Sequence, residues 1–79
     1  MSDRVQQFLH DVADEVRRAE TLHAPLNSAH EAYAVILEEL DEFKAEVWKK
    51  AGRRDLAAMR QELLQVAAMC ARTVENLQL

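Results

Sequence analysis

The stretch that decides the fold is Ser28–Trp48, which reads SAHEAYAVILEELDEFKAEVW. Its first four residues form an S-x-x-E capping box, in which Ser28 and Glu31 satisfy backbone donors at a helix start. Apolar residues then recur at three- and four-residue steps, which is typical of one face of an amphipathic helix. The members of that face are Ala29, Tyr33, Ile36, Leu37, Leu40, Phe43, Val47 and Trp48. A row of carboxylates runs along its edge.

Two further helices are predicted, over residues 2–23 and 54–77, on either side of the central helix at 28–50. The first repeats the apolar spacing at Val5, Phe8, Leu9, Val12, Val16, Ala19 and Leu22. It should end before Pro25, because the residue before a proline is pushed out of the helical region. The third carries the spacing at Leu56, Met59, Leu63, Val66, Ala67, Cys70, Val74 and Leu77. Between them, Gly52 is expected to adopt the left-handed conformation that ends many helices.

These patterns predict an all-α chain that forms a single domain over residues 1–79. The helices at 28–50 and 54–77 should pair as a central antiparallel hairpin, because the connection between them is short. The first helix must then cover that hairpin or reach a second subunit. Three helices in 79 residues leave a thin core. We therefore expect a homo-oligomer whose apolar faces complete the bundle.

The amino-acid composition indicates which classes of binding partner and which cellular location to expect. The chain is 49% hydrophobic and 30% charged, with one Gly and one Pro, which suits a folded helical protein. A formal net charge of −4 argues against a nucleic-acid polymer, which would need a concentrated basic surface. The absence of a long apolar run argues against a membrane span, and charges near the N-terminus argue against a signal peptide. The single Cys70 is expected to be a small core residue in a reducing cytoplasm.

The row of carboxylates is the one candidate for chemistry. Glu39 and Glu42 are three residues apart and are therefore neighbours on the helix surface, and Glu46 lies further along the same edge. If the hairpin packs antiparallel, Glu62 of the third helix can join Glu39 and Glu42. Carboxylates on rigid neighbouring helices suit Mg²⁺, which prefers oxygen ligands. The same spacing is also that of a solvated acidic edge with basic neighbours, so the residues alone leave both interpretations open.

A resemblance favours the metal site. EELDEF (38–43) followed by RQELLQVAAMCARTVENL (60–77) resembles the MazG-like, all-α nucleoside triphosphate pyrophosphohydrolase superfamily. That family carries E-x-x-E on one helix and E-x-x-D on the next, and all four residues hold Mg²⁺. Glu39, Glu42 and Glu62 match three of these positions. The resemblance implies a MazG-like bundle assembled as a dimer or tetramer. It also implies Mg²⁺-dependent (or Mn²⁺-dependent) hydrolysis of a (deoxy)nucleoside triphosphate to monophosphate and pyrophosphate.

The fourth position departs from the family, because Gln65 stands where the family has Asp. A neutral amide oxygen is a weaker ligand for a hard cation than a carboxylate. Either Gln65 or Glu46 completes the site, or the site is degenerate. The alternative function is a catalytically inactive helical module that serves oligomerisation, nucleotide binding or protein interaction on the same scaffold.

The remaining candidates concern the substrate. Trp48 and Tyr33 could stack on a base, although their place on the apolar stripe favours packing in the core. Lys49 could meet phosphate oxygens, or it could simply complement the C-terminal end of a helix. Arg72 lies off the apolar stripe and could reach either a phosphate or an acidic neighbour.

Overall fold

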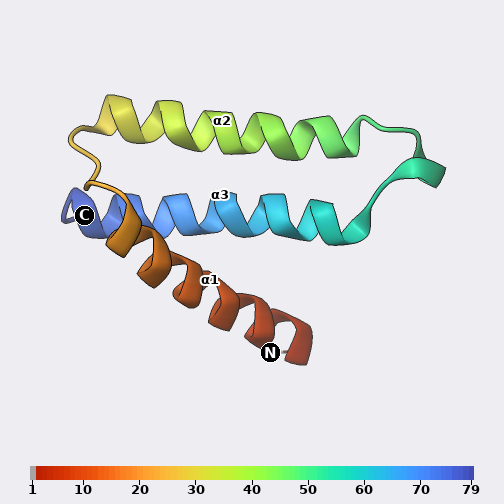
Figure 1. The fold of residues 1–79 in the computed structure, drawn as a ribbon, viewed down its shortest axis with the longest axis horizontal. Coiled ribbons are helices and arrows are strands. Elements are labelled where there is room, and N and C mark those ends of the chain that lie inside the picture. Colours follow the sequence, from red (N-terminus) through yellow and green to blue (C-terminus); the bar gives the residue numbers. More distant parts are fainter. Residues whose placement is uncertain (1) are drawn as a thin grey trace.

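The chain folds into three α-helices, seen here in a computed structural model that describes residues 2–79 (Figure 1). They are α1 (Asp3–Leu22), α2 (Ala29–Val47) and α3 (Leu56–Asn76), with a single 3₁₀ turn, η1 (Ala51–Arg53), between α2 and α3. Each helix begins and ends within three residues of its predicted bounds. Residues 2–79 contain no strand, so the all-α prediction is confirmed.

Side-chain caps define the helix starts. Ser2, Ser28 and Asp55 each accept a hydrogen bond from a backbone N–H three residues further on, over 3.2, 3.1 and 3.1 Å. The Glu31 carboxylate of the capping box accepts from the Asn27 side chain at 3.4 Å. The bonds to Ser2, Ser28 and Asp55 satisfy backbone N–H groups that have no partner within the helix.

The cap of α2 gives a first testable prediction. Ser28→Ala should lower the free energy of unfolding by about 1 kcal/mol, because the Glu31 N–H loses its acceptor. In a domain of this size that loss lowers Tm by roughly 4–8 °C, which thermal unfolding followed by circular dichroism will measure. Ser28→Asp keeps an acceptor oxygen and is the matched control. A loss in Ser28→Asp as large as that in Ser28→Ala would contradict a capping role.

Helices α2 and α3 lie side by side and run antiparallel, as predicted (Figure 1). Near the open end of this hairpin the core consists of Leu26, Ala32 and Met69, against which Val35, Ile36 and Leu77 pack. Leu26 belongs to the connection between α1 and α2, and its backbone N–H donates to the side chain of Asn76 at 2.7 Å. The connection is therefore part of the core.

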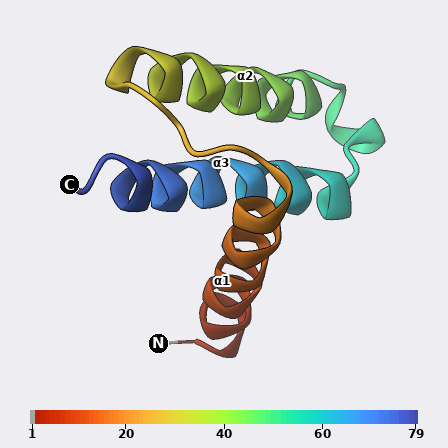
Figure 2. The same ribbon diagram turned by 60° about the vertical axis from the view of Figure 1, so that its left-hand side comes forward.

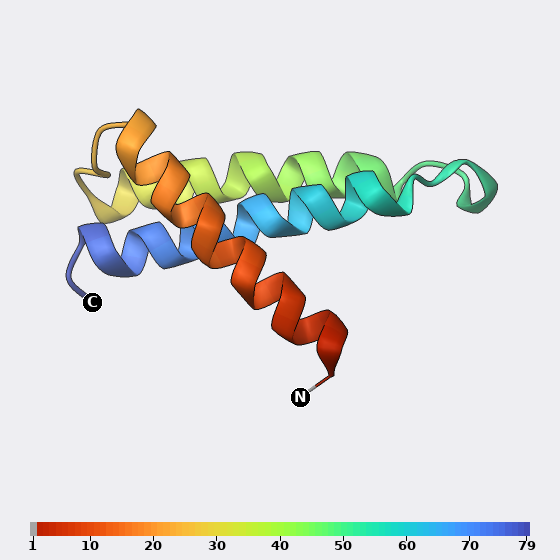
Figure 3. The ribbon, with the colours of Figure 1, turned by 60° about the horizontal axis from the view of Figure 1, so that its bottom comes forward.

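Helix α1 crosses α3 obliquely and leaves α2 largely uncovered (Figures 2 and 3). Small residues make this approach possible, since Ala19 and Ala68 are both buried. Two ion pairs hold the helices together: Arg60 with Asp11 at 2.7 Å, and Arg72 with Glu20 at 3.0 Å. Towards the start of α1 the two helices diverge around an apolar hollow of about 530 Å³.

The structure corrects four sequence expectations. Gly52 does not take a left-handed conformation, because α2 already ends at Val47 and Gly52 lies inside η1. Cys70 is exposed rather than part of the core. Tyr33 and Trp48 are also exposed, by 69% and 74%. The three exposed side chains share one reason: the apolar arcs predicted for the second and third helices are wider than the strip that one neighbouring helix can cover.

Candidate functional site

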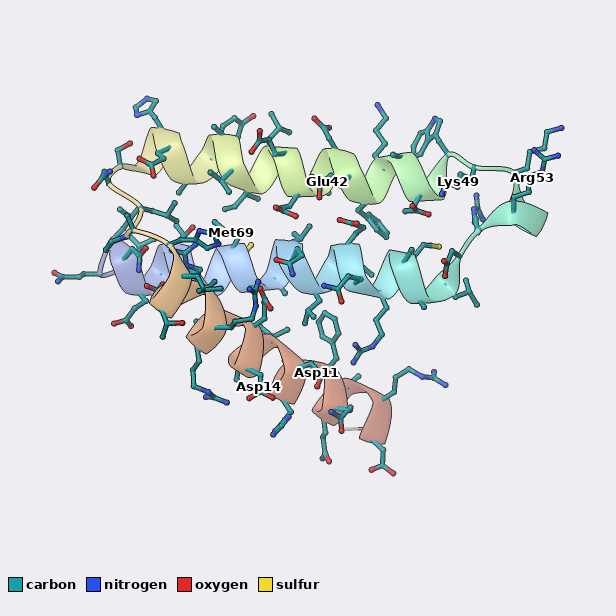
Figure 4. All side chains as sticks on the ribbon, in the orientation of Figure 1. Asp11, Asp14, Glu42, Lys49, Arg53 and Met69 are labelled. Carbon is teal, nitrogen blue, oxygen red and sulfur yellow. The ribbon has the colours of Figure 1, made fainter. Side chains whose placement is uncertain are left out.

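The three predicted carboxylates meet at one edge of the hairpin. Glu39 and Glu42 come from the middle of α2, and Glu62 comes from the first half of α3. Figure 4 labels Glu42 on α2. One oxygen from each lies within 4.8 Å of the others. The three-residue spacing places the first two on adjacent turns, and the antiparallel packing of α3 brings the third beside them.

The cluster is electrostatically unfavourable without a cation. Burial, followed by the charge of Glu42, raises the pKa of Glu39 to about 7. Burial and Glu42 also raise the pKa of Glu62. In the described part of the chain none of the three carboxylates forms an ion pair with a Lys, Arg or His side chain. The fold therefore holds these groups together against their mutual repulsion.

This geometry fits a divalent cation. With Mg–O bonds of about 2.1 Å, two ligand oxygens lie roughly 3 Å apart when adjacent and about 4.2 Å apart when opposite. Oxygens within 4.8 Å of one another reach those separations with small side-chain rotations. Three carboxylates also supply the oxygen ligands and the charge that Mg²⁺ or Mn²⁺ requires.

A second acidic group on α1 offers a useful contrast. His10, Asp11 and Asp14 also bring ligand atoms within 4.8 Å of one another. Figure 4 labels Asp11 and Asp14 on this helix. There, however, Asp11 is paired with Arg60 and Asp14 with Arg17, at 2.7 and 2.6 Å. The Arg60 guanidinium lowers the pKa of Asp11. These carboxylates already have cationic partners, so a metal ion would have to displace an arginine.

A cavity of about 320 Å³ adjoins the carboxylate cluster between the three helices. The apolar lining residues are Ala19, Ala24, Leu26, Val35 and Met69. The polar lining residues are Glu15, Arg18, His23, Glu31, Gln65 and Arg72, together with Glu39. Glu39 is thus shared by the cluster and the cavity. The volume lies at the lower end of the range for small-molecule sites, which is about 300–1,000 Å³.

Gln65 and Glu46, the two candidates for a fourth metal ligand, have different neighbours in the structure. Gln65 lines the cavity with Glu39, and its side-chain amide contributes to the lowered pKa of Glu15, behind the larger effect of Arg18. Glu46 lies close enough to Glu62 to help raise its pKa. Both Glu46 oxygens accept from the Lys49 ammonium, at 2.9 and 3.0 Å. Glu46 is therefore already neutralised, whereas Gln65 faces the cavity.

The predicted substrate residues are dispersed. Trp48 lies at the C-terminal end of α2 with the Lys44 ammonium 5.4 Å from its ring, and Lys49 holds Glu46 beside it (Figure 4). Arg72 is only 4% exposed and donates to the Glu20 carboxylate and to the Ala24 carbonyl, at 3.0 and 3.2 Å. The sequence left two possible partners for Arg72, a phosphate or an acidic side chain. In the structure its partner is the acidic side chain of Glu20.

Sequence reasoning missed the contribution of α1 to the cavity. Glu15 and Arg18 are an ordinary i,i+3 pair on the polar side of that helix, and nothing in their spacing distinguishes them from other surface pairs. They line the cavity only because α1 crosses α3 at this point. No protein-family model, curated protein or solved structure matches the chain.

Proposed function

We propose that the protein is a Mg²⁺-dependent nucleoside triphosphate pyrophosphohydrolase of the MazG-like kind. The observation that carries the proposal is the convergence of Glu39, Glu42 and Glu62, with one oxygen from each within 4.8 Å of the others. The resemblance assigns metal ligands to these same three residues. The fold gathers these residues from two helices without a basic partner and against their own repulsion, which a cation-binding site explains better than a solvated acidic edge.

In this proposal the carboxylates hold the ion that neutralises phosphate oxygens and helps to orient a water molecule for attack. Glu39 is shared with the cavity, so phosphates held at the cluster leave the nucleoside next to the cavity. Val35 and Met69 then offer apolar contact to a base, and Gln65 offers both a hydrogen-bond donor and an acceptor. None of the residues acts as a covalent nucleophile.

The decisive experiment measures pyrophosphate release from a panel of nucleoside triphosphates with Mg²⁺ or Mn²⁺. We expect turnover by the wild type and a loss of at least roughly 100-fold in Glu42→Gln, since one ligand charge disappears. Asp41→Asn is the matched control, because Asp41 is exposed on the same turn and lies outside the cluster. If Glu42→Gln and Asp41→Asn lose the same amount of turnover, the assignment of Glu42 as a metal ligand is wrong.

Gln65 favours a second candidate, a catalytically silent module on the same scaffold. A cluster with three carboxylates holds a cation less strongly than one with four. Gln65→Asp tests this candidate directly. If the wild type is inactive and Gln65→Asp acquires Mg²⁺-dependent turnover, the scaffold has lost an activity that one carboxylate restores. If both are inactive, the protein is no pyrophosphohydrolase.

A further inference from the structure

The end of the hairpin where α2 turns into α3 concentrates positive charge. Residues 44–54 hold five of the ten Lys and Arg side chains of the chain and one acidic side chain, Glu46, so their formal charge is +4. The whole chain has a formal charge of −4, which leaves −8 on the other residues. We call this end the basic tip and define it by six exposed residues: Lys44, Trp48, Lys49, Lys50, Arg53 and Arg54 (Figure 4 labels Lys49 and Arg53).

Most of these cations have no acidic partner. Lys49 pairs with Glu46 at 2.9 Å. The Arg54 Nε donates to the Val47 carbonyl at 3.0 Å, which fixes this side chain beside the end of α2. A helix C-terminus carries only about half a negative charge, so it does not account for the remaining cations. Within residues 2–79, four of the five form no ion pair with a carboxylate: Lys44, Lys50, Arg53 and Arg54.

An exposed indole ring lies among these cations. Trp48 is the single tryptophan of the chain and is 74% exposed. Its side chain borders two shallow hollows of about 440 and 290 Å³. Lys44 lines the larger hollow together with Asp41, and Lys49 and Arg54 line the smaller one. Trp48 is thus shared by two hollows, each of which has a cationic side chain in its lining.

An aromatic ring among unpaired cations is suited to the surface of an anionic membrane. Tryptophan is enriched at the level of the lipid headgroups, because its ring is apolar and its N–H is polar. Each Lys or Arg near an anionic leaflet strengthens attachment roughly fivefold. The two hollows beside Trp48 leave room for headgroups next to Lys44 and next to Arg54.

The shape of the molecule keeps much of its negative charge away from such a surface. The basic tip is one end of the longest dimension, which is 41 Å (Figure 1). Glu31, near the other end of α2, is sixteen residues or roughly 24 Å from Val47 along the helix. The Debye length at physiological ionic strength is about 8 Å, so carboxylates at that distance are screened. An acidic protein of this shape can therefore meet a negative surface with its tip first.

A nucleic-acid polymer fits the basic tip less well. Proteins that bind single strands without sequence preference use a positively charged groove that follows the backbone. Here the cations surround the protruding end of a hairpin (Figure 1). The tip therefore offers a small contact for a flat surface and no track for a long polymer.

We propose that the basic tip docks the protein on a membrane surface that contains anionic phospholipids. Trp48 enters the headgroup layer, and Lys50, Arg53 and Arg54 contact phosphate oxygens. No helix within residues 2–79 is long and apolar enough to cross a bilayer. This proposal goes beyond the proposed function, because it holds equally for an active enzyme and for a silent scaffold.

The first test titrates the wild type with vesicles and follows the fluorescence of Trp48, which reports on the basic tip alone. Vesicles of phosphatidylcholine mixed with phosphatidylglycerol should shift the emission to shorter wavelength, and high salt should abolish the shift. Vesicles of phosphatidylcholine alone should bind more weakly by roughly tenfold or more. An emission that the anionic vesicles leave unchanged, or that both kinds of vesicle change equally, would overturn the proposal.

Co-sedimentation with the anionic vesicles then tests the charges. Lys50→Gln combined with Arg53→Gln should weaken binding roughly 25-fold, because two cations are lost. The matched control combines Arg4→Gln with Arg17→Gln, which removes the same charge from exposed positions on α1 and should change binding less than about twofold. Circular dichroism checks that all proteins keep their helicity. Equal losses in the two double variants would mean that net charge alone governs binding, and the tip would not be the docking surface.

The ring is tested in the same assay. Trp48→Ser should weaken binding roughly fivefold or more, because less apolar area enters the headgroup layer. Tyr33→Ser is the matched control, since it removes a ring that is 69% exposed near the other end of α2. If Tyr33→Ser weakens binding as much as Trp48→Ser does, the protein does not dock through its tip.

Two competitors distinguish a lipid surface from other anions. Inorganic pyrophosphate at matched ionic strength should not release the protein from anionic vesicles. Release would make the tip a site for free phosphate and would overturn the proposal. A single-stranded oligonucleotide should change the Trp48 emission only at higher phosphate concentration than the vesicles do. A stronger response to the oligonucleotide than to the vesicles would assign the tip to nucleic acid instead.

Discussion

At pH 8 and without divalent cations, Glu39→Gln is expected to be more stable than the wild type. Burial and Glu42 raise the pKa of Glu39 from 4.5 to about 7, so ionising this carboxyl costs free energy in the fold. At about 1.4 kcal/mol per unit of pKa, the full shift corresponds to roughly 3–4 kcal/mol. Because the Glu39 side chain is partly exposed, solvent screening lowers the expected gain to roughly 2 kcal/mol. Urea denaturation of both proteins at pH 8 will measure it.

The sign of the pH dependence follows from the raised pKa. The stability that the protonated carboxyl contributes is fully present below its unfolded pKa of about 4.5, and it is lost as pH rises through 7. The wild type should therefore lose stability between about pH 4.5 and 7, and Glu39→Gln should lose much less. A Glu39→Gln variant that is less stable than the wild type at pH 8 would mean that the carboxylate is favourably paired in the fold.

Mg²⁺ or Mn²⁺ should reverse this order. The wild type should gain stability with the logarithm of ion concentration, by about 2.7 kcal/mol at one hundred times the Kd. Glu39→Gln should gain little, because it has lost one of three ligands. Glu38→Gln is the matched control, since Glu38 lies outside the cluster and its charge is the weakest of the causes that raise the pKa of Glu39. An equal response in all three proteins would exclude a metal site here.

Arg72→Met is expected to destabilise the protein by roughly 2–4 kcal/mol. Removing one partner of a fully buried ion pair costs about 3–5 kcal/mol, and the cost is lower here because the Glu20 side chain is 28% exposed. The guanidinium is almost completely buried and joins α3 to α1 and to the connection between α1 and α2. A domain of this length is typically stable by only roughly 4–12 kcal/mol. Urea denaturation of Arg72→Met should therefore show the loss of a large part of the total free energy of unfolding.

Arg17→Met is the matched control, because Arg17 also pairs with a carboxylate, Asp14, but at the surface of α1. It should cost less than about 1 kcal/mol, as exposed ion pairs do. The pH profile adds a second signature. Arg72 lowers the pKa of Glu20, so the stability from this pair is present above pH ~4.5 and is lost as pH falls further. If Arg72→Met and Arg17→Met lower the free energy of unfolding equally, burial of the Arg72 ion pair does not increase its contribution to stability.

Local pattern predicted the elements of this fold well. Ser28 and Asp55 mark helix starts through their own side chains, and Pro25 marks the end of the first helix, so each signal lies within a few residues of what it determines. The position of Glu62 beside Glu39 and Glu42 also follows from local information. It requires only that two helices with a short connection pack antiparallel.

The apolar spacing in the sequence could not predict how much of each apolar face a neighbouring helix covers. Tyr33 and Leu40 belong to the same predicted apolar face as the partly buried Ile36 and Phe43, and only the direction of α3 distinguishes the exposed members from the covered ones. The position at which α1 crosses α3 could not be predicted from the sequence for a similar reason. It depends on Asp11 meeting Arg60, and on Glu20 meeting Arg72 and Asn76, which are 49 to 56 residues apart in the chain.

That separation has a consequence for the order in which the protein folds during synthesis. The connection between α1 and α2 is tied by Leu26 to Asn76, and Glu20 accepts from Arg72 and Asn76. Helix α1 and the connection after it are made about 50 residues before Arg72 and Asn76, which hold them. A nascent chain that stops before residue 72 can form isolated helices and part of the hairpin without closing the core. The three helices should therefore pack together only after residue 76 has left the ribosome.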